Sequence, residues 1–179
     1  PRTCPAALAP VFVGTAIAEF EGSFRPLIAL LALIVALALQ VGVNYANDYS
    51  DGIRGTDDDR VGPVRLVGQG LAEPNKVKQA AIIAFTVSAV AGLGMTLLSQ
   101  MWLLIPIGIA AIAAAWFYTG GAKPYGYYGY GELFVFVFFG LVAVAGTSAS
   151  QTGQVTILAL LGGVSCGALS TAILVSNNL

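Results

Sequence analysis

Long apolar runs dominate this chain, and they restrict its fold more than any other feature. No charged residue stands between Arg25 and Asp48, and about 20 mostly apolar residues are enough for a helix to cross a bilayer. Charged residues make up 9% of the chain, whereas an average soluble domain has about 25%. Because so few charges cannot cover a water-exposed surface, we predict an all-α fold, a polytopic transmembrane helical bundle.

Six segments have the length and composition of candidate transmembrane helices. They are residues 5–18, 26–51, 76–98, 102–119, 132–147 and 155–178. The first segment is short, the chain begins with proline rather than methionine, and no polar tail follows the last segment. We therefore expect a single transmembrane domain over residues 1–179 that is incomplete at both ends.

Basic residues are concentrated in two of the predicted loops. The loop after the second segment contains Arg54, Arg60, Arg65, Lys76 and Lys78, and the loop after the fourth contains Lys123. Loops rich in Lys and Arg face the cytoplasm in most membrane proteins. We therefore expect an integral membrane protein in which both loops, and Arg2 at the N-terminus, lie on the cytoplasmic side.

Composition excludes several kinds of chemistry. The chain has no histidine, which excludes a His general base, a haem His ligand and most zinc sites. Cys4 and Cys166 are far apart in apolar surroundings and indicate neither a disulfide framework nor a metal motif. Eight basic residues nearly balance nine acidic ones, so net charge indicates no nucleic-acid partner.

A polar stripe marks the end of the second segment. When each residue advances by about 100° along a helix, one face of this segment carries Gln40, Asn44, Asn47, Asp48 and Asp51. Acidic residues within membrane segments usually face a bundle interior or a watery cavity. The alternative is a solvated helix end, although such an end would be polar on all sides. We favour a functional site at this stripe.

The stripe and the loop after it suit a metal-bound diphosphate. The candidate metal ligands are Asn44, Asn47, Asp48, Asp51 and the later Asp57. Oxygen ligands of this kind suit Mg²⁺, which shares its shell between one or two carboxylates and substrate phosphates. The candidate diphosphate ligands are Arg54, Arg60, Arg65 and Lys123. A guanidinium group can donate two parallel hydrogen bonds to phosphate oxygens. Calcium transport or a proton relay, by contrast, would use the acidic residues but would not require the arginines.

The segment "FYTGGAKPYGYYGYGE" forms a second polar cluster. Its Lys123 is the only charged residue between Lys78 and Glu132, and we expect it on the same side of the membrane as the acids, accessible to a phosphate. Tyr118 lies at the exit of the fourth segment. The four later tyrosines have an alternative explanation as an aromatic belt at the membrane interface.

The last segment ends in "LVSNNL". Two terminal asparagines alone suit an ordinary helix end. Beside "VNYAND", however, Asn177 and Asn178 look like a partial second copy of the same motif at the end of a helix with the same orientation.

These motifs resemble a known family. The stretch "NYANDYSDGIRGTDDDR" resembles the first aspartate-rich motif of the UbiA superfamily of intramembrane aromatic prenyltransferases. Together with "RTCPAALAPVFVGTA" and "LVSNN", it is most similar to the 1,4-dihydroxy-2-naphthoate polyprenyltransferase branch of menaquinone biosynthesis. The resemblance covers essentially the whole chain and implies a nine-helix fold. Asn47, Asp48 and Asp51 match the usual NDxxDxxxD form, but the last aspartate comes later, at Asp57, which leaves its contact with metal open.

The resemblance implies a Mg²⁺-dependent prenyl transfer in a bacterial cell membrane. Mg²⁺ bound by the first motif, and by a second that begins at Asn178, would hold a polyprenyl diphosphate. Ionisation would leave an allylic carbocation, and dihydroxynaphthoate would attack it with loss of CO₂ to give a demethylmenaquinol.

The same resemblance assigns roles to individual residues. The expected catalytic residues are Asp48, Asp51, Tyr118 and Lys123. Tyr118 could shield the cation through the face of its ring. Arg2 is a candidate partner of the naphthoate carboxylate. An equal alternative is that Arg2 only sets the orientation of the chain in the membrane, as a positive residue on the cytoplasmic side.

Three other functions remain as alternatives. A related aromatic prenyltransferase would use 4-hydroxybenzoate as acceptor. A CDP-alcohol phosphotransferase would need further aspartates after "DGIRG", yet the chain has no Asp after Asp59. A cation-coupled transporter would use Asp48 and Asp51 without diphosphate, because fold does not determine function.

Overall fold

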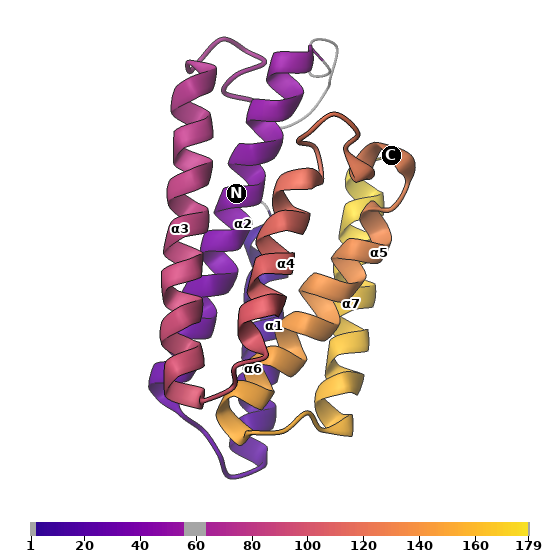
Figure 1. Ribbon diagram of the computed structural model, residues 1–179. Helices are drawn as coiled ribbons and strands as arrows, with labels where there is room; N and C mark the ends of the chain where they lie inside the picture. Colours follow the sequence, from indigo (N-terminus) through magenta and orange to yellow (C-terminus); the bar gives the residue numbers. More distant parts are fainter. Residues whose placement is uncertain (1–2, 56–63, 179) are drawn as a thin grey trace.

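The computed structural model describes residues 3–55 and 64–178, and this part of the chain contains helices and no strand. The elements are α1 (Cys4–Phe20), α2 (Pro26–Arg54), α3 (Pro74–Ser99), α4 (Leu104–Phe117), η1 (Tyr125–Tyr128), α5 (Gly131–Val135), η2 (Phe136–Val142), α6 (Ala143–Thr152) and α7 (Ile157–Asn178). The elements α5, η2 and α6 follow one another without a break, with a π-helical segment in the middle (Figure 1). The predicted all-α fold is confirmed.

The six predicted segments all become helices, but with different lengths. Four helical runs are long and apolar enough to cross a membrane: Pro26–Arg54, Pro74–Ser99, Gly131–Thr152 and Ile157–Ser176. The helices α1 and α4 are shorter, with 17 and 14 residues. The run predicted over 132–147 continues to Thr152, and the second predicted segment ends at Arg54 rather than Asp51.

Proline and glycine mark the helix ends. Pro26 and Pro74 stand in the first turns of α2 and α3, where the missing N–H costs least. Gly55 and Gly153 follow α2 and α6 with φ of 70° and 83°, a left-handed conformation that glycine adopts without steric cost. These signals explain why the long apolar runs break where they do.

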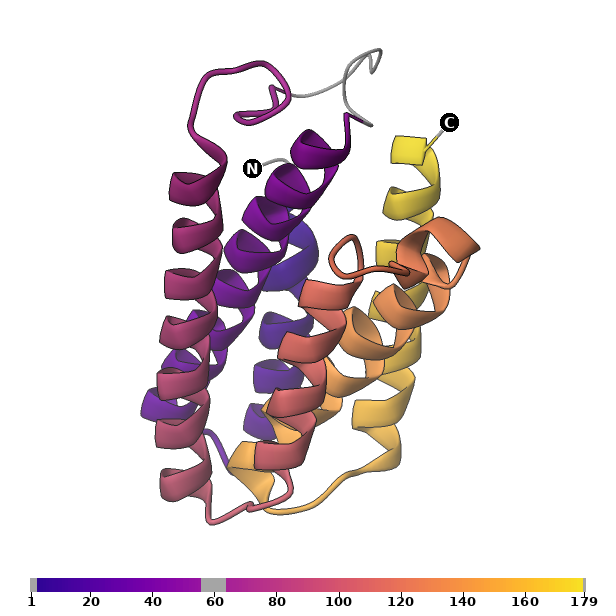
Figure 2. The same cartoon turned by 45° about the horizontal axis from the view of Figure 1, so that its top comes forward.

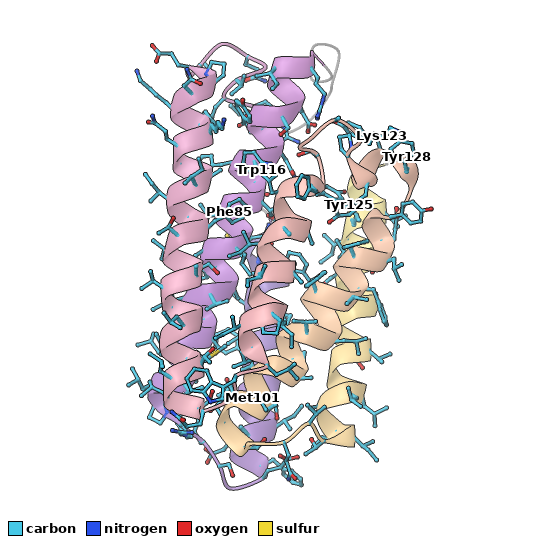
Figure 3. All side chains as sticks on the ribbon, in the orientation of Figure 1. Phe85, Met101, Trp116, Lys123, Tyr125 and Tyr128 are labelled. Atoms are coloured by element: carbon cyan, nitrogen blue, oxygen red, sulfur yellow. The ribbon has the colours of Figure 1, made fainter. Side chains whose placement is uncertain are left out.

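The helices run alternately up and down, so that the polar loops gather at one end of the bundle. The end of α2, the start of α3, the loop after α4 and the end of α7 share this end (Figures 1 and 2). We call it the loop end. The most extensive helix pair is α2 with α3, while α7 packs on η2 and α1 packs on α6. Figure 3 shows Lys123 and Tyr128 at the loop end and Met101 at the opposite one.

The bundle exposes many large apolar side chains and buries many small ones. Ile83, Val90 and Leu169 are more than 60% exposed, as lipid-facing residues of a membrane bundle would be. Fully buried positions include Ala18, Ala46 and other alanines. Small residues let the helix backbones approach closely, and that contact replaces the hydrophobic effect as the source of helix association in lipid.

The helices η2 and α7 approach closely through their backbones. A methyl group added at Gly140 would lie 2.5 Å from both the Gly163 carbonyl oxygen and the Gly167 Cα. Both atoms belong to the backbone and cannot turn aside as a flexible side chain can. The crossing of η2 and α7 therefore depends on glycine at this position.

Candidate functional site

Asp48 holds the chain segment that precedes α3. Its Oδ2 accepts a hydrogen bond of 2.9 Å from the backbone N–H of Leu66, and its Oδ1 accepts one of 3.0 Å from Val67. The side chain of Val67 also packs against Gly52, where a Cβ would lie only 2.5 Å away. Asp48 is 6% exposed, so this carboxylate joins the last turns of α2 to the returning loop.

Asp51, one turn further, faces different partners. Its Oδ1 accepts a hydrogen bond from the Tyr127 hydroxyl, and its Oδ2 lies 3.8 Å from the guanidinium of Arg65. Asp51 is also buried, at 6% exposure. Since a buried carboxylate needs a compensating donor or cation, these two contacts explain how the charge is tolerated.

The loop after α4 is attached to α2 by two further residues. The Thr119 hydroxyl donates to Asn47 Oδ1 at 2.8 Å. The Arg54 guanidinium donates to the carbonyl oxygens of Thr119 and Gly121 and lies 5.8 Å from the centre of the Tyr127 ring. Arg54 was expected in the loop after α2, but it belongs to the last turn of the helix. In this structure its planar fork binds the backbone of the second loop.

The expected tyrosine–lysine cluster separates into two parts. Tyr118 lies edge-on to Tyr125, with ring centres 5.6 Å apart, and Tyr125 stacks on Phe134 at 4.1 Å. The pKa of Tyr125 is raised above its ordinary value of 10.0, mainly because the hydroxyl is buried and secondly because of the neighbouring Tyr118. Its hydroxyl donates to the Ala114 carbonyl oxygen at 2.8 Å. Lys123 is exposed and lies in the loop after α4, at the loop end (Figure 3).

A cavity of about 510 Å³ opens between the helices beside this cluster. Its wall is mainly apolar and includes residues of α1, α2, α3, α4, α5, η2, α6 and α7. Asn44 and Asn47 line it, whereas Asp48 and Asp51 do not. The polar stripe of α2 is thus divided: its amides face the cavity and its carboxylates face the two loops.

The deeper part of the stripe contains an incompletely paired amide. Gln40 lines the cavity and is 4% exposed. Its Nε2 donates to the Thr3 hydroxyl at 2.8 Å, while its Oε1 is buried and accepts no hydrogen bond from the part of the chain that the structure describes. A buried polar atom left in this state costs about 1–3 kcal/mol.

The side-chain oxygen atoms at the end of α2 are of the type that Mg²⁺ binds. In residues 3–55 and 64–178, no three His, Cys, Asp or Glu side chains come together. Mg²⁺ does not require three, because it takes one or two carboxylates and completes its shell with substrate phosphates and water. Asp48 and Asp51 supply the carboxylates, and the amides of Asn44 and Asn47 lie beside them on the same helix.

Several expected site residues lie outside the described part of the chain. These are Arg2, Asp57 and Arg60. Asn178 ends α7 at the loop end, but its side chain is also outside the described part. Other residues were missed by sequence reasoning. Tyr127, Thr119 and Thr3 contact the stripe from segments distant in the chain, and no local sequence signal distinguishes them.

The family model of the UbiA prenyltransferase family matches residues 7–179. The chain belongs to this family. The resemblance noted from the aspartate-rich motif is therefore confirmed, and the four membrane-length helices agree with the integral membrane character of a UbiA prenyltransferase.

Curated relatives match over the whole length of this UbiA chain. A "1,4-dihydroxy-2-naphthoate octaprenyltransferase" of Mycobacterium leprae (strain TN) is 59% identical over 179 residues, which cover 100% of this chain and 60% of the relative. The protein of the same name from Escherichia coli (strain K12) is 42% identical, with 100% and 60% covered. The "UbiA prenyltransferase domain-containing protein 1" of Gallus gallus is 29% identical, with 99% and 54% covered. The chain thus spans about 60% of the length of these octaprenyltransferases.

Proposed function

We propose that the protein transfers a polyprenyl group from a polyprenyl diphosphate to 1,4-dihydroxy-2-naphthoate. The products are a demethylmenaquinol, diphosphate and CO₂. The observation that carries this proposal is that Asn44 and Asn47 line an apolar cavity while Asp48 and Asp51 stand beside them on α2, in a chain that is 59% identical to named dihydroxynaphthoate octaprenyltransferases. A charged diphosphate can lie at the loop end while its apolar tail lies between the helices.

The residues at the end of α2 would bind the diphosphate and its cation. Asp48 and Asp51 would hold Mg²⁺, with Asn44 and Asn47 as further oxygen donors. When bound, the cation supplies positive charge that stabilises the departing diphosphate. Arg65 already lies against Asp51 and Lys123 is exposed at the same end, so both can approach phosphate oxygens. Arg60 and Asp57 belong to the proposal on sequence grounds alone.

Arg54 has a different role in this proposal from the one expected of a free arginine. Its guanidinium donors are directed at two backbone carbonyls of the loop after α4. In our proposal Arg54 holds that loop over the diphosphate site. It would bind phosphate only after giving up its hydrogen bonds to the two carbonyl oxygens.

The cavity would hold the tail and the site of carbon–carbon bond formation. Its volume of about 510 Å³ falls within the range of about 300–1,000 Å³ typical of ligand sites. Tyr118 lines it near the loop end, where the face of its ring could stabilise an allylic cation. Arg2 would pair with the naphthoate carboxylate. By the distribution of basic residues, we place the loop end at the cytoplasmic face of a bacterial cell membrane.

A direct assay tests the proposed function. Membranes that contain the full-length protein are incubated with dihydroxynaphthoate, octaprenyl diphosphate and Mg²⁺, and the prenylated quinol is measured by mass spectrometry. We expect product only when all three are present, and none after chelation of Mg²⁺ by EDTA. Replacing dihydroxynaphthoate by 4-hydroxybenzoate tests the acceptor, and faster turnover with 4-hydroxybenzoate would contradict our assignment.

Tyr127 is expected to position the Asp51 carboxylate. Tyr127→Phe removes the hydroxyl that donates to Asp51 and keeps the ring beneath Arg54. Mutation of a residue that hydrogen-bonds to a metal ligand commonly lowers metal affinity or activity by about 10–100-fold. We therefore expect the Mg²⁺ concentration for half-maximal activity to rise about 10-fold. Tyr128→Phe is the matched control, because Tyr128 is 63% exposed. Identical Mg²⁺ curves for the wild type and Tyr127→Phe would refute the role.

A further inference from the structure

We propose that Gln40, together with Thr3, forms the binding site for a hydroxyl group of the aromatic acceptor. This inference deepens the proposed function and rests on it. It assigns an acceptor contact to a part of the cavity deeper than the metal-binding turns.

The amide nitrogens of this polar corner already have acceptors. Gln40 Nε2 lies 2.8 Å from Thr3 Oγ1 and 3.5 Å from Asn44 Oδ1. Asn44 Nδ2 donates to the same Thr3 oxygen at 3.2 Å. These contacts tie the start of α1 to the middle of α2 and hold the Gln40 amide in one orientation.

The acceptor atom of the same amide is unused. Gln40 Oε1 is buried and accepts no hydrogen bond from residues 3–55 and 64–178, although buried polar atoms are almost always paired. All three residues of the corner line the cavity. A donor supplied by the contents of the cavity would complete the pairing.

The chemistry of the three reactants decides which of them supplies that donor. A polyprenyl tail has only C–H groups, and Mg²⁺ diphosphate offers oxygens that accept hydrogen bonds. A hydroxylated aromatic acceptor carries O–H donors. The open Oε1 therefore selects the acceptor among the three.

The aromatic part of the cavity wall suits a flat ring. Tyr118 at the end of α4, Phe134 in α5 and Phe138 in η2 all line it, and the rings of Phe134 and Phe138 are 6.1 Å apart and nearly parallel. Aromatic rings pack favourably against one another in offset or edge-to-face arrangements. A planar acceptor can contact these rings while its hydroxyl reaches the amide corner.

The position along α2 is also suitable. Gln40 precedes Asp48 by eight residues, which is about 12 Å along the helix axis at about 1.5 Å per residue. An acceptor held at Gln40 therefore lies beside the diphosphate site without occupying it.

Steady-state kinetics test the inference. Gln40→Leu removes the amide and keeps a similar volume. We expect the KM for dihydroxynaphthoate to rise about 5–150-fold, because the acceptor hydroxyl is left buried without a partner, while the KM for octaprenyl diphosphate and the Mg²⁺ requirement stay unchanged. The control is Gln79→Leu, the same substitution at an exposed position of α3. An unchanged acceptor KM would show that a buried water satisfies Oε1, and an equal rise in both KM values would indicate a general distortion; either result overturns the proposal.

A second measurement needs no variant. Equilibrium binding to the wild type is compared for dihydroxynaphthoate, 1-hydroxy-2-naphthoate and 4-hydroxy-2-naphthoate, each without diphosphate. We expect one single-hydroxyl analogue to bind at least about 10-fold more weakly, because a site that binds a hydroxyl rejects the analogue without it. Equal binding of all three overturns the proposal even if Gln40→Leu fails to fold. A wild type that prenylates no hydroxylated aromatic compound would instead refute the proposed function.

Discussion

Replacing Asp51 by alanine is expected to lower turnover by at least about 10²–10³-fold, the usual effect of removing one group that stabilises charge in a transition state. Asp51 is the clearer of the two carboxylates to test. Asp48 also accepts the backbone N–H groups of Leu66 and Val67, so its loss would loosen a loop as well as a metal ligand. The measurement is turnover at saturating substrate over a range of roughly 1–20 mM Mg²⁺.

The variant Asp51→Asn separates the charge from the loop contact. Its amide oxygen can still accept the Tyr127 hydroxyl but carries no charge for a cation. We expect a loss nearly as large as for Asp51→Ala. Glu73→Gln is the matched control, since Glu73 is an exposed acid that pairs with Lys76 at the loop end at 3.2 Å. Wild-type turnover in Asp51→Asn at every Mg²⁺ concentration would show that Asp51 is not a metal ligand.

The second large effect concerns folding rather than chemistry. Gly140→Val is expected to prevent or strongly destabilise the packing of η2 on α7, because even a Cβ at this position would lie 2.5 Å from backbone atoms of Gly163 and Gly167. Overpacking costs typically about 1–3 kcal/mol and sometimes more, and here the neighbouring backbone cannot yield. The yield of monodisperse protein in detergent and its midpoint of thermal unfolding report the effect.

Gly146→Ala provides the control within the same helical run. A Cβ added at Gly146 meets nothing within 4 Å, so we expect an unfolding midpoint close to that of the wild type. If Gly140→Val and Gly146→Ala unfold at the same temperature, the close contact of η2 with α7 does not determine stability.

The sequence was sufficient to predict the helices and the position of the polar stripe. Hydropathy locates the long apolar runs because lipid requires every backbone group to be paired within a helix. Helical periodicity then places Gln40, Asn44 and Asp48 on one face. The aspartate-rich motif was specific enough for the family. Lengths were less accurate, because the fifth segment continues past its predicted end through the polar residues Ser148, Ser150 and Gln151 to Thr152.

Contacts between distant segments could not be predicted in the same way. Tyr125, Tyr127, Tyr128 and Tyr130 are equivalent candidates in the sequence. Only the fold directs Tyr127 to Asp51 and Tyr125 to Phe134. Likewise, periodicity groups Asn47 with Asp48, yet the packing of α1 and of the two loops separates the amides from the carboxylates. Such assignments depend on which segments meet, and a local pattern does not contain that information.

The small-residue interior has a consequence for natural variation and for engineering. In a soluble protein, large core side chains resist change and surface positions accept it. In this bundle the large residues, such as Ile83 and Leu169, lie on the exterior and can exchange with other apolar residues of different shape. The smallest ones, such as Gly140, have no permissible substitute. A saturation library of this chain should therefore tolerate changes of bulk outside and reject a single added methyl group where helix backbones touch, as at Gly140.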